Sequence, residues 1–323
     1  MKIDKTKPSH WLLLGLFTIN VVIAMLWRPF YGRSRKKTTT VVLYGHKLNS
    51  NLLAIYRLLR VKHRKAIEPV FLTMDPAYYR RLRANGDSAC LAIAPACASV
   101  LARADAVISD HGLHSLQIML GRSNIRFFDV WHGIPFKGFD AEDFRIQHRY
   151  DETWVPSPLL ADLYTQRFGF APEQVKITGY ARTDILVAPQ ESDGAIRQRL
   201  GLGHTIGQRL VLFAPTWKQD AQQRSLFPFG VEGQCFLEKL TVVCQRNGAK
   251  LLLRVHLNTK DPVTLPDDGV IPVPFADYPD TEAILRISDV LIKRQWGNRS
   301  PLESFATQMP QEIPPNVSTG TRF

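Results

Sequence analysis

Apolar and polar positions along the first half of the chain follow two alternating patterns. Short apolar runs rich in β-branched residues predict buried strands at residues 38–45, 68–74, 104–110, 124–133, 151–157 and 174–179. Apolar residues at helical spacing predict helices between several of these strands, at residues 49–59, 78–82, 113–120 and 158–168. Strands that alternate with helices are typical of a parallel sheet with helices on both faces.

The second half of the chain repeats the pattern after a polar linker with a short helix at residues 189–208. Strands are predicted at 209–218, 250–258, 269–274 and 288–292, and helices at 236–243 and 280–287. A length of 323 residues is enough for two ordinary domains. We therefore predict two α/β domains, at residues 38–188 and 189–292.

The N-terminal segment has a different pattern. Residues 11–27 are apolar except for Thr18 and Asn20, with a tryptophan at each end. About 17 residues is the short end of what crosses a bilayer as a helix, and tryptophans favour membrane interfaces. We interpret residues 1–37 as a membrane anchor with a basic flanking segment. The alternative is a helix that lies on the membrane or in the core.

Basic residues are more numerous after this apolar run than before it. Those after the run are Arg28, Arg33, Arg35, Lys36 and Lys37, against Lys2, Lys5 and Lys7 before it. The positive-inside rule then places the following domains in the cytoplasm. The whole chain has a formal net charge of +12, which indicates an acidic partner such as a membrane surface or phosphorylated substrates. The sequence has no RNA-binding signature or zinc-finger spacing, so we expect no nucleic-acid partner.

The four cysteines, Cys90, Cys97, Cys235 and Cys244, form no CxxC pair. We expect buried free thiols in a reducing compartment. His111 and His114 have the i,i+3 spacing of a helical metal site, but no further ligand follows at a suitable distance. We therefore expect no metal there.

The segment WHGIPFKGF, residues 131–139, directly follows a predicted strand. In parallel sheets, ligands bind beyond the carboxyl ends of the strands. His132 at this place could act as a general base, Gly133 could allow close backbone approach, and Lys137 could bind a phosphate. On the residues alone, a structural role for His132 is an equal alternative.

Two further segments carry cationic residues at strand ends. Arg182, in GYARTDIL, could bind phosphate with both guanidinium nitrogens, and a helix-start salt bridge with Asp184 is the alternative. Arg254 and His256 alternate along a strand and so share one face, where they could stabilise a pyrophosphate. The alternative for His256 is a purely structural strand-end histidine.

Together these segments resemble the CDP-glycerol glycerophosphotransferase family, whose members make teichoic acids and some capsule polymers. WHGIPFKGF, GYARTDIL, FAPTWK (213–218), RVHLN (254–258) and residues 275–292 are similar to elements of that family, in the same order. The resemblance extends from about Val41 to Ile292.

The resemblance implies a GT-B-like α/β fold, with two Rossmann-like domains facing each other across a cleft. It implies that His132 is the base and that His256 stabilises the donor phosphates. The substrate-binding residues that it implies are Gly133, Lys137, Arg182, Asp184, Thr216, Trp217, Lys218 and Arg254. The implied reaction transfers glycerol phosphate from CDP-glycerol to a lipid-linked or polymeric acceptor at the cell membrane and needs no metal or cofactor.

The sequence departs from the family after residue 292. The family continues with Thr-Asp, an aromatic residue and two serines, whereas residues 293–323 are proline-rich and have no clear period. We expect a frameshift or truncation near Lys293 that leaves the second domain incomplete. A GT-B glycosyltransferase that uses a nucleotide sugar, and an inactive membrane-anchored remnant, are the alternatives. The acceptor, the choice of glycerol or ribitol phosphate and the oligomeric state stay open.

Overall fold

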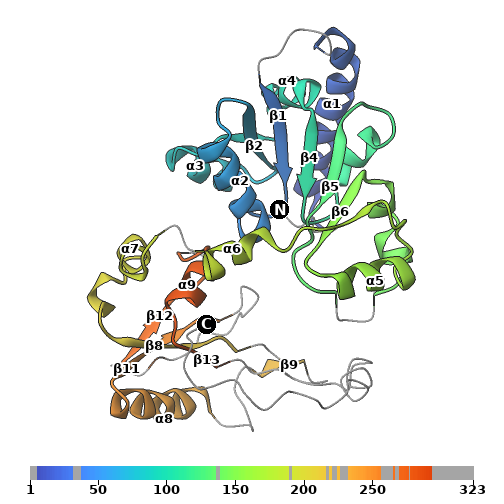
Figure 1. The fold of residues 1–323 in the computed structure, drawn as a ribbon. Helices are drawn as coiled ribbons and strands as arrows, with labels where there is room; N and C mark the ends of the chain where they lie inside the picture. The colour runs from blue at the N-terminus through green and yellow to red at the C-terminus, as the bar shows by residue number, and fades with distance from the viewer. Residues whose placement is uncertain are drawn as a thin grey trace. The chain divides into compact units, whose positions relative to one another are not determined.

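The computed structural model describes residues 6–31, 38–135, 139–188, 191–215, 218–219, 224–225, 232–255, 265, 269–275 and 277–292. The chain divides into two compact units, residues 1–182 and residues 183–323 (Figure 1). The boundary predicted from the sequence lies a few residues later, after residue 188. Both units contain parallel sheets with helices, so the predicted α/β class is confirmed.

The first unit is built on a parallel sheet of seven strands in the order β3-β2-β1-β4-β5-β6-β7. The strands are β1 (Thr39–Tyr44), β2 (Ile67–Thr73), β3 (Ala89–Leu91), β4 (Ala106–Ser109), β5 (Arg126–Asp129), β6 (Glu152–Val155) and β7 (Val175–Ile177). The strand order reverses between β1 and β4. In sheets of this kind, ligands bind at the carboxyl ends of the strands at such a reversal.

The helices of the first unit begin where local sequence favours a helix start. They are α1 (Pro8–Tyr31), α2 (Ser50–Lys62), α3 (Pro76–Ala84), α4 (Ala96–Arg103) and α5 (Pro158–Gln166), with short 3-10 helices η1 (His114–Met119), η2 (Glu142–Phe144), η3 (Gln147–Arg149) and η4 (Ala181–Thr183). The Asp75 carboxylate accepts hydrogen bonds from the first turn of α3, and Ser157 caps α5 in the same way. A proline follows each cap, as is typical of a first helical position.

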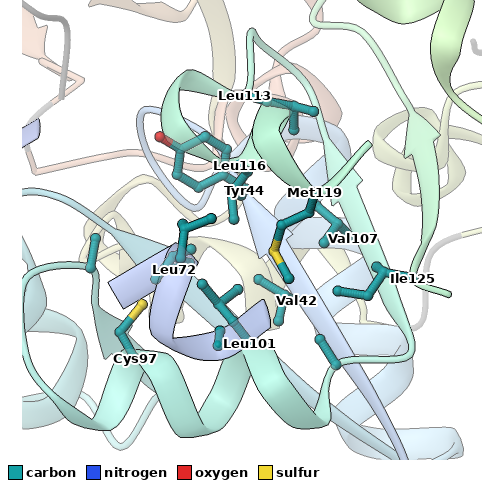
Figure 2. Close-up of a cluster of buried hydrophobic side chains, with 14 of the residues drawn as sticks. Val42, Tyr44, Leu72, Cys97, Leu101, Val107, Leu113, Leu116, Met119 and Ile125 are labelled. Carbon is teal, nitrogen blue, oxygen red and sulfur yellow. The ribbon is translucent and has the colours of Figure 1, made fainter. Parts of the chain in front are cut away.

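Helices cover both faces of the seven-stranded sheet. Leu52 of α2 and Tyr78 of α3 pack with Leu43 and Phe71 on one face. On the other face α4 and η1 cover the sheet with a buried apolar cluster (Figure 2). The cluster includes Val42, Tyr44, Leu72, Cys97, Leu101, Val107, Leu113, Leu116, Met119 and Ile125. Helix α1 packs on this same cluster.

The second unit has a parallel sheet in the order β12-β11-β8-β13. Its strands are β8 (Arg209–Phe213), β11 (Ala249–Leu253), β12 (Val270–Pro272) and β13 (Val290–Ile292). The short strands β9 (Lys218–Gln219) and β10 (Arg224–Ser225) pair antiparallel in a separate sheet. Its helices are α6 (Asp184–Val187), α7 (Asp193–Arg199), η5 (Gly203–Thr205), α8 (Gly233–Arg246) and α9 (Thr281–Ile287). Ile284 of α9 and Leu237 of α8 are buried in separate clusters with strand residues.

The cysteines are free thiols. Cys90, Cys97 and Cys244 are buried, while Cys235 is partly exposed. The buried thiols therefore serve as small apolar groups of the core.

Candidate functional site

Three histidines from different loops meet at the carboxyl edge of the seven-stranded sheet. His46 follows β1, His111 follows β4, and His132 follows β5. The ring centroids of His46 and His111 lie 4.3 Å apart. Those of His111 and His132 also lie 4.3 Å apart, and the rings of this second pair are nearly parallel. We call these three residues the histidine cluster. It stands at the reversal of strand order, where the topology favours ligand binding.

A backbone contact fixes the proton on the His132 ring. Its Nδ1 lies 2.9 Å from the backbone carbonyl oxygen of Asp110. A carbonyl oxygen only accepts hydrogen bonds, so Nδ1 must donate. In the neutral ring, Nε2 then carries the lone pair. This is the arrangement that a general base requires.

Asp110 contacts two members of the cluster. Its Oδ1 lies 2.6 Å from Nδ1 of His111, while its backbone oxygen accepts from His132. Its carboxylate leaves no room for a side chain at residue 45, because a Cβ on Gly45 would lie 2.3 Å from Asp110 Oδ1. Glycine is therefore required where β1 ends beside the cluster.

A small pocket opens beside the cluster. Its lining is formed by Tyr44, Gly45, His46, Met74, His111, Gly112 and His114. The Tyr44 hydroxyl lies 2.8 Å from Nδ1 of His114, so it links the end of β1 to the loop after β4. Among the described residues, no group of three or more His, Cys, Asp or Glu is arranged to hold a metal ion.

Burial favours the uncharged forms of His46 and His132. Burial, together with the neighbouring His111, lowers the pKa of His46 to about 3. The pKa of His132 is also lowered, chiefly by partial burial of its ring, although the hydrogen bond to Asp110 opposes this. A lowered pKa keeps His132 unprotonated at neutral pH, as a base must be.

Three residues around the site have left-handed backbone conformations that are unusual for side-chain-bearing residues. The φ angles are 52° at Ser50, 47° at His114 and 34° at Trp131. They are the positive-φ residues other than glycine in the described part of the chain. Backbone strain of this kind collects at functional sites.

Asn51 joins three segments of the site and was not predicted from the sequence. Its Nδ2 donates to the backbone oxygens of Val130 and Trp131, at 2.9 and 3.1 Å. Its Oδ1 accepts from the backbone N–H of Arg182 at 3.2 Å. The buried Asn51 side chain thus holds the exit of β5 against α2 and η4. An asparagine near a helix start is too common in sequences to indicate this role.

The structure places Arg182 and Gly133 close to His132. The Arg182 guanidinium donates to Ser50 Oγ at 2.9 Å and reaches the His132 backbone oxygen at 3.5 Å. The backbone oxygen of Gly133 accepts from the Tyr180 hydroxyl. The sequence therefore identified residues that lie together at this edge, and their substrate contacts stay predictions.

Other predicted residues belong to the second unit. Asp184 begins α6 and is exposed. Arg254 is buried, and its guanidinium donates to the Val273 backbone oxygen at 3.0 Å and to Thr281 Oγ1 at 2.8 Å. These bonds hold the exit of β11 against β12 and α9. Binding of a donor phosphate by Arg254 stays a prediction.

The remaining predicted residues cannot be placed. Lys137, Thr216, Trp217 and His256 lie outside the described residues. Lys218 is described only as the first residue of β9. The expected frameshift near Lys293 also lies beyond the last described residue.

Known proteins share both sequence and fold with this chain. A family model described as CDP-glycerol:poly(glycerophosphate) glycerophosphotransferase matches residues 25–293. Teichoic acid ribitol-phosphate polymerase TarL of Staphylococcus aureus is 27% identical over 207 residues, which cover 60% of this chain and 36% of TarL. The teichoic acid poly(glycerol phosphate) polymerase of Bacillus spizizenii is 22% identical over 189 residues, which cover 52% of this chain and 46% of that protein. The chain therefore spans less than half the length of these relatives.

Solved structures show the same fold. Wall teichoic acid polymerase TagF superimposes with a TM-score of 0.62 at 18% identity, over 89% of this chain and 75% of that chain. UDP-GlcNAc 2-epimerase from Neisseria meningitidis gives a TM-score of 0.50 at 8% identity, over 80% of this chain and 78% of that chain. At these identities the likeness shows the fold alone, and it agrees with the predicted GT-B-like class.

Proposed function

Because the chain belongs to the CDP-glycerol:poly(glycerophosphate) glycerophosphotransferase family, we propose that it transfers glycerol phosphate from CDP-glycerol to a lipid-linked or polymeric acceptor of a cell-surface polymer. In this reaction an acceptor hydroxyl oxygen attacks the β-phosphorus of CDP-glycerol. The bond from that phosphorus to the bridging oxygen breaks, and CMP leaves. The hydroxyl proton passes to the base. Transfer of this kind depends mainly on positioning and on stabilisation of charge.

His132 is the proposed base, and its geometry is the observation that carries the proposal. The hydrogen bond from Nδ1 to the Asp110 backbone oxygen leaves Nε2 with its lone pair. The lowered pKa keeps the ring neutral. A positioned base of this type contributes roughly 10²–10⁴-fold to a rate. The acceptor is then bound on the side of the first unit.

The donor phosphates are proposed to bind mainly cationic groups that the family resemblance indicates. The assigned residues are His256, Arg254, Lys137, Arg182, Lys218 and Thr216, with Gly133, Asp184 and Trp217 in supporting positions. Arginine, lysine and histidine suit this role because their N–H groups match phosphate oxygens. One of the TagF structures was obtained with a CDPG soak.

Ribitol phosphate is the second candidate for the transferred group. Two matched relatives, TarL and TarK of Staphylococcus aureus, are teichoic acid ribitol-phosphate polymerases. Both candidates use the same phosphorus chemistry and differ only in the polyol. The proposed setting is the cytoplasmic face of the cell membrane, where the basic segment at residues 33–37 would meet acidic lipid headgroups.

The test uses membranes that contain the full chain. CDP-glycerol, CDP-ribitol and a UDP-sugar are supplied separately, each labelled in the transferred group. We expect release of CMP and label in the extracted lipid or polymer with a CDP-polyol. His132→Ala should lower the rate by roughly 10²–10⁴-fold, while His63→Ala, at an exposed position at the end of α2, should not.

Each other outcome contradicts a defined part of the proposal. Release of UDP from the sugar donor would favour a glycosyltransferase. Transfer from a CDP-polyol that persists in His132→Ala would remove His132 from the reaction. Absence of transfer with all three donors would favour the inactive, membrane-anchored remnant.

A further inference from the structure

Three polar side chains lie next to one another on neighbouring strands of the seven-stranded sheet. Ser109 of β4 pairs in register with Asp129 of β5, and Asp129 pairs in register with Thr153 of β6. Residues in register on parallel strands present their side chains to the same face. All three are 0% exposed, at a depth where apolar side chains are the rule. An ionisable carboxyl group in this row requires a reason, because burial of a charge is costly.

The two carboxyl oxygens of Asp129 have different surroundings. Oδ1 accepts a hydrogen bond from the backbone N–H of Trp131 at 3.3 Å. Oδ2 is buried and has no hydrogen-bond partner within the described part of the chain, and the same holds for Thr153 Oγ1. A carboxylate oxygen can only accept, whereas a protonated carboxyl oxygen donates to a hydroxyl group. The surroundings of Oδ2 therefore suit an uncharged carboxylic acid better than a carboxylate.

The titratable groups that interact with Asp129 are themselves acids. In the described part of the chain they are Asp110 after β4, Tyr150 before β6, Tyr164 of α5, and Tyr180. Burial, together with the Asp110 charge, raises the pKa of Asp129 to about 7, although the Trp131 N–H opposes this. Burial and the Asp129 charge in turn raise the pKa of all three tyrosines. A carboxyl group among buried acids keeps its proton more readily than one in water.

The Asp129 side chain also holds the turn that carries the proposed base. The Trp131 N–H donates to Asp129, and the Trp131 backbone oxygen accepts from Asn51 Nδ2 at 3.1 Å. These two bonds fix the peptide groups on both sides of a residue whose φ is 34°. His132 follows directly, and its ring centroid lies 4.4 Å from that of Trp131. Loss of the Asp129 bond would free this strained turn and displace the His132 ring.

We propose that Asp129 is a positioning residue for the transfer reaction, which sets the direction of the His132 ring without touching a reacting atom. In this role Asp129 is an uncharged acid: Oδ1 accepts the Trp131 N–H, and the Oδ2–H group donates to the Thr153 hydroxyl. The inference rests on the proposed function, because it assigns Asp129 to the placement of the proposed base. Asparagine would make the same two bonds, since its amide offers one acceptor and one donor in the same places.

Steady-state kinetics of CMP release by the full chain test this role. Asp129→Ala removes both bonds, and we expect kcat to fall by roughly 10–100-fold with KM for the CDP-polyol near the wild-type value. Asp129→Asn keeps both bonds, so its kcat should stay near the wild-type value. Thr153→Val removes only the acceptor hydroxyl and should lower kcat less than Asp129→Ala does.

Thr241→Val is the matched control for the loss of a buried hydroxyl. Thr241 of α8 is buried, and its hydroxyl has no partner among the described residues, but it belongs to the second unit. We expect its kcat to equal that of the wild type. A rate as low as that of Thr153→Val would show that any such hydroxyl matters, and would overturn the specific role of the Asp129–Thr153 pair.

The other kinetic outcomes are equally decisive. If Asp129→Asn is as slow as Asp129→Ala, a charged carboxylate is required and the inference is wrong. A wild-type kcat in a folded Asp129→Ala protein would remove the positioning role. If Asp129→Ala does not fold, the other two variants decide: a full rate in Asp129→Asn with a reduced rate in Thr153→Val supports the inference, and the reverse overturns it.

Two spectra test the placement of His132 without the reaction. Nitrogen-15 spectra of the histidine-labelled full chain, assigned with His132→Gln, report which ring nitrogen carries the proton. We expect Nδ1 to carry it in the wild type and in Asp129→Asn, and a mixture of both tautomers in Asp129→Ala. Infrared spectra at pH 6, below the Asp129 pKa of about 7, should show a protonated carboxyl band that Asp129→Asn removes.

These spectra separate the inference from the proposed function. If the wild type transfers nothing from any donor, the proposed function fails, and the spectra still decide whether Asp129 positions the His132 ring. An unchanged His132 tautomer in Asp129→Ala, or the absence of the carboxyl band in the wild type, would overturn the inference even where transfer is observed.

Discussion

At the scale of single residues, the protonation of His132 follows from its neighbours. Nδ1 is committed to the Asp110 backbone oxygen, and partial burial lowers the ring pKa below the ordinary value of 6.5. The neutral base is therefore present at pH 7 and is lost only when the pH falls through the lowered pKa. We predict that the acidic limb of kcat/KM has its midpoint below pH 6.5, measured as CMP release. A midpoint above 6.5 would contradict this assignment.

The Asp129 side chain at the end of β5 is fully buried. Burial and the nearby Asp110 charge raise the pKa of Asp129 to about 7. An unfolded chain releases this proton near its ordinary value of 3.8. Between these two values the unfolded state binds fewer protons, so the free energy of unfolding falls as pH rises from about 4 to about 7. We predict that Asp129→Asn flattens this dependence, measured by urea unfolding at pH 5 and pH 8. Equal slopes in the two proteins would contradict the prediction.

Asn51 offers a test of how the site is held. Asn51→Ala leaves two buried carbonyl groups without a donor, so we expect a loss of about 1–3 kcal/mol in the free energy of unfolding. Asn49→Ala is the matched control, because the Asn49 side chain makes no capping hydrogen bond and should cost less. Chemical unfolding measures both. Equal losses would show that Asn51 does not hold the exit of β5.

Site residues could be predicted only where they stand in a distinctive short segment of the sequence. His132 and Arg182 stand in distinctive segments beside strand ends, and the structure places both at one edge. His46 and His111 were not predicted as partners of His132. Their meeting depends on β1 and β4 being neighbours, which is a property of strand order and not of any local pattern.

At the scale of elements, the apolar runs in the sequence correctly predicted most of the strands and helices. Strand β3 was missed because it has only three residues. Helix α4 was missed because its sequence, ACASVLAR, is rich in small residues and gives a weak apolar period. The helix predicted at 113–120 is the 3-10 helix η1, which begins at the left-handed His114.

Asn20 provides a prediction about α1 as an element. Asn20→Ala removes the donor from two carbonyl groups, so the free energy of unfolding should fall by about 1–3 kcal/mol. Gly15→Ala has open space around its Cβ and should instead stabilise the helix by about 0.5–1 kcal/mol. Chemical unfolding of the full chain measures both changes. An unchanged stability in Asn20→Ala would show that α1 is not tied to the first unit in solution.

At the scale of the whole molecule, the two units have separate cores. The first unit contains the complete seven-stranded sheet and the histidine cluster. We predict that a fragment of residues 1–182 unfolds cooperatively on its own, measured by circular dichroism during urea titration. The His132 resonance in that fragment should still titrate below pH 6.5. A fragment without a cooperative transition would show that the first unit depends on the second.

The incomplete second unit stays a prediction, because residues 293–323 lie outside the described part of the chain. Strand β13 lies at one edge of its sheet, and Val290 and Leu291 are 49% and 48% exposed. Apolar side chains on an edge strand favour pairing with a further strand.

The left-handed conformations of Ser50, His114 and Trp131 carry a cost that the rest of the first unit must offset. Glycine would relieve that cost at each position. A laboratory selection for heat resistance alone would therefore enrich glycine at these three positions. The most heat-stable of these variants would have a less ordered edge at the candidate site, so heat stability and function should be selected together in any attempt to improve this protein.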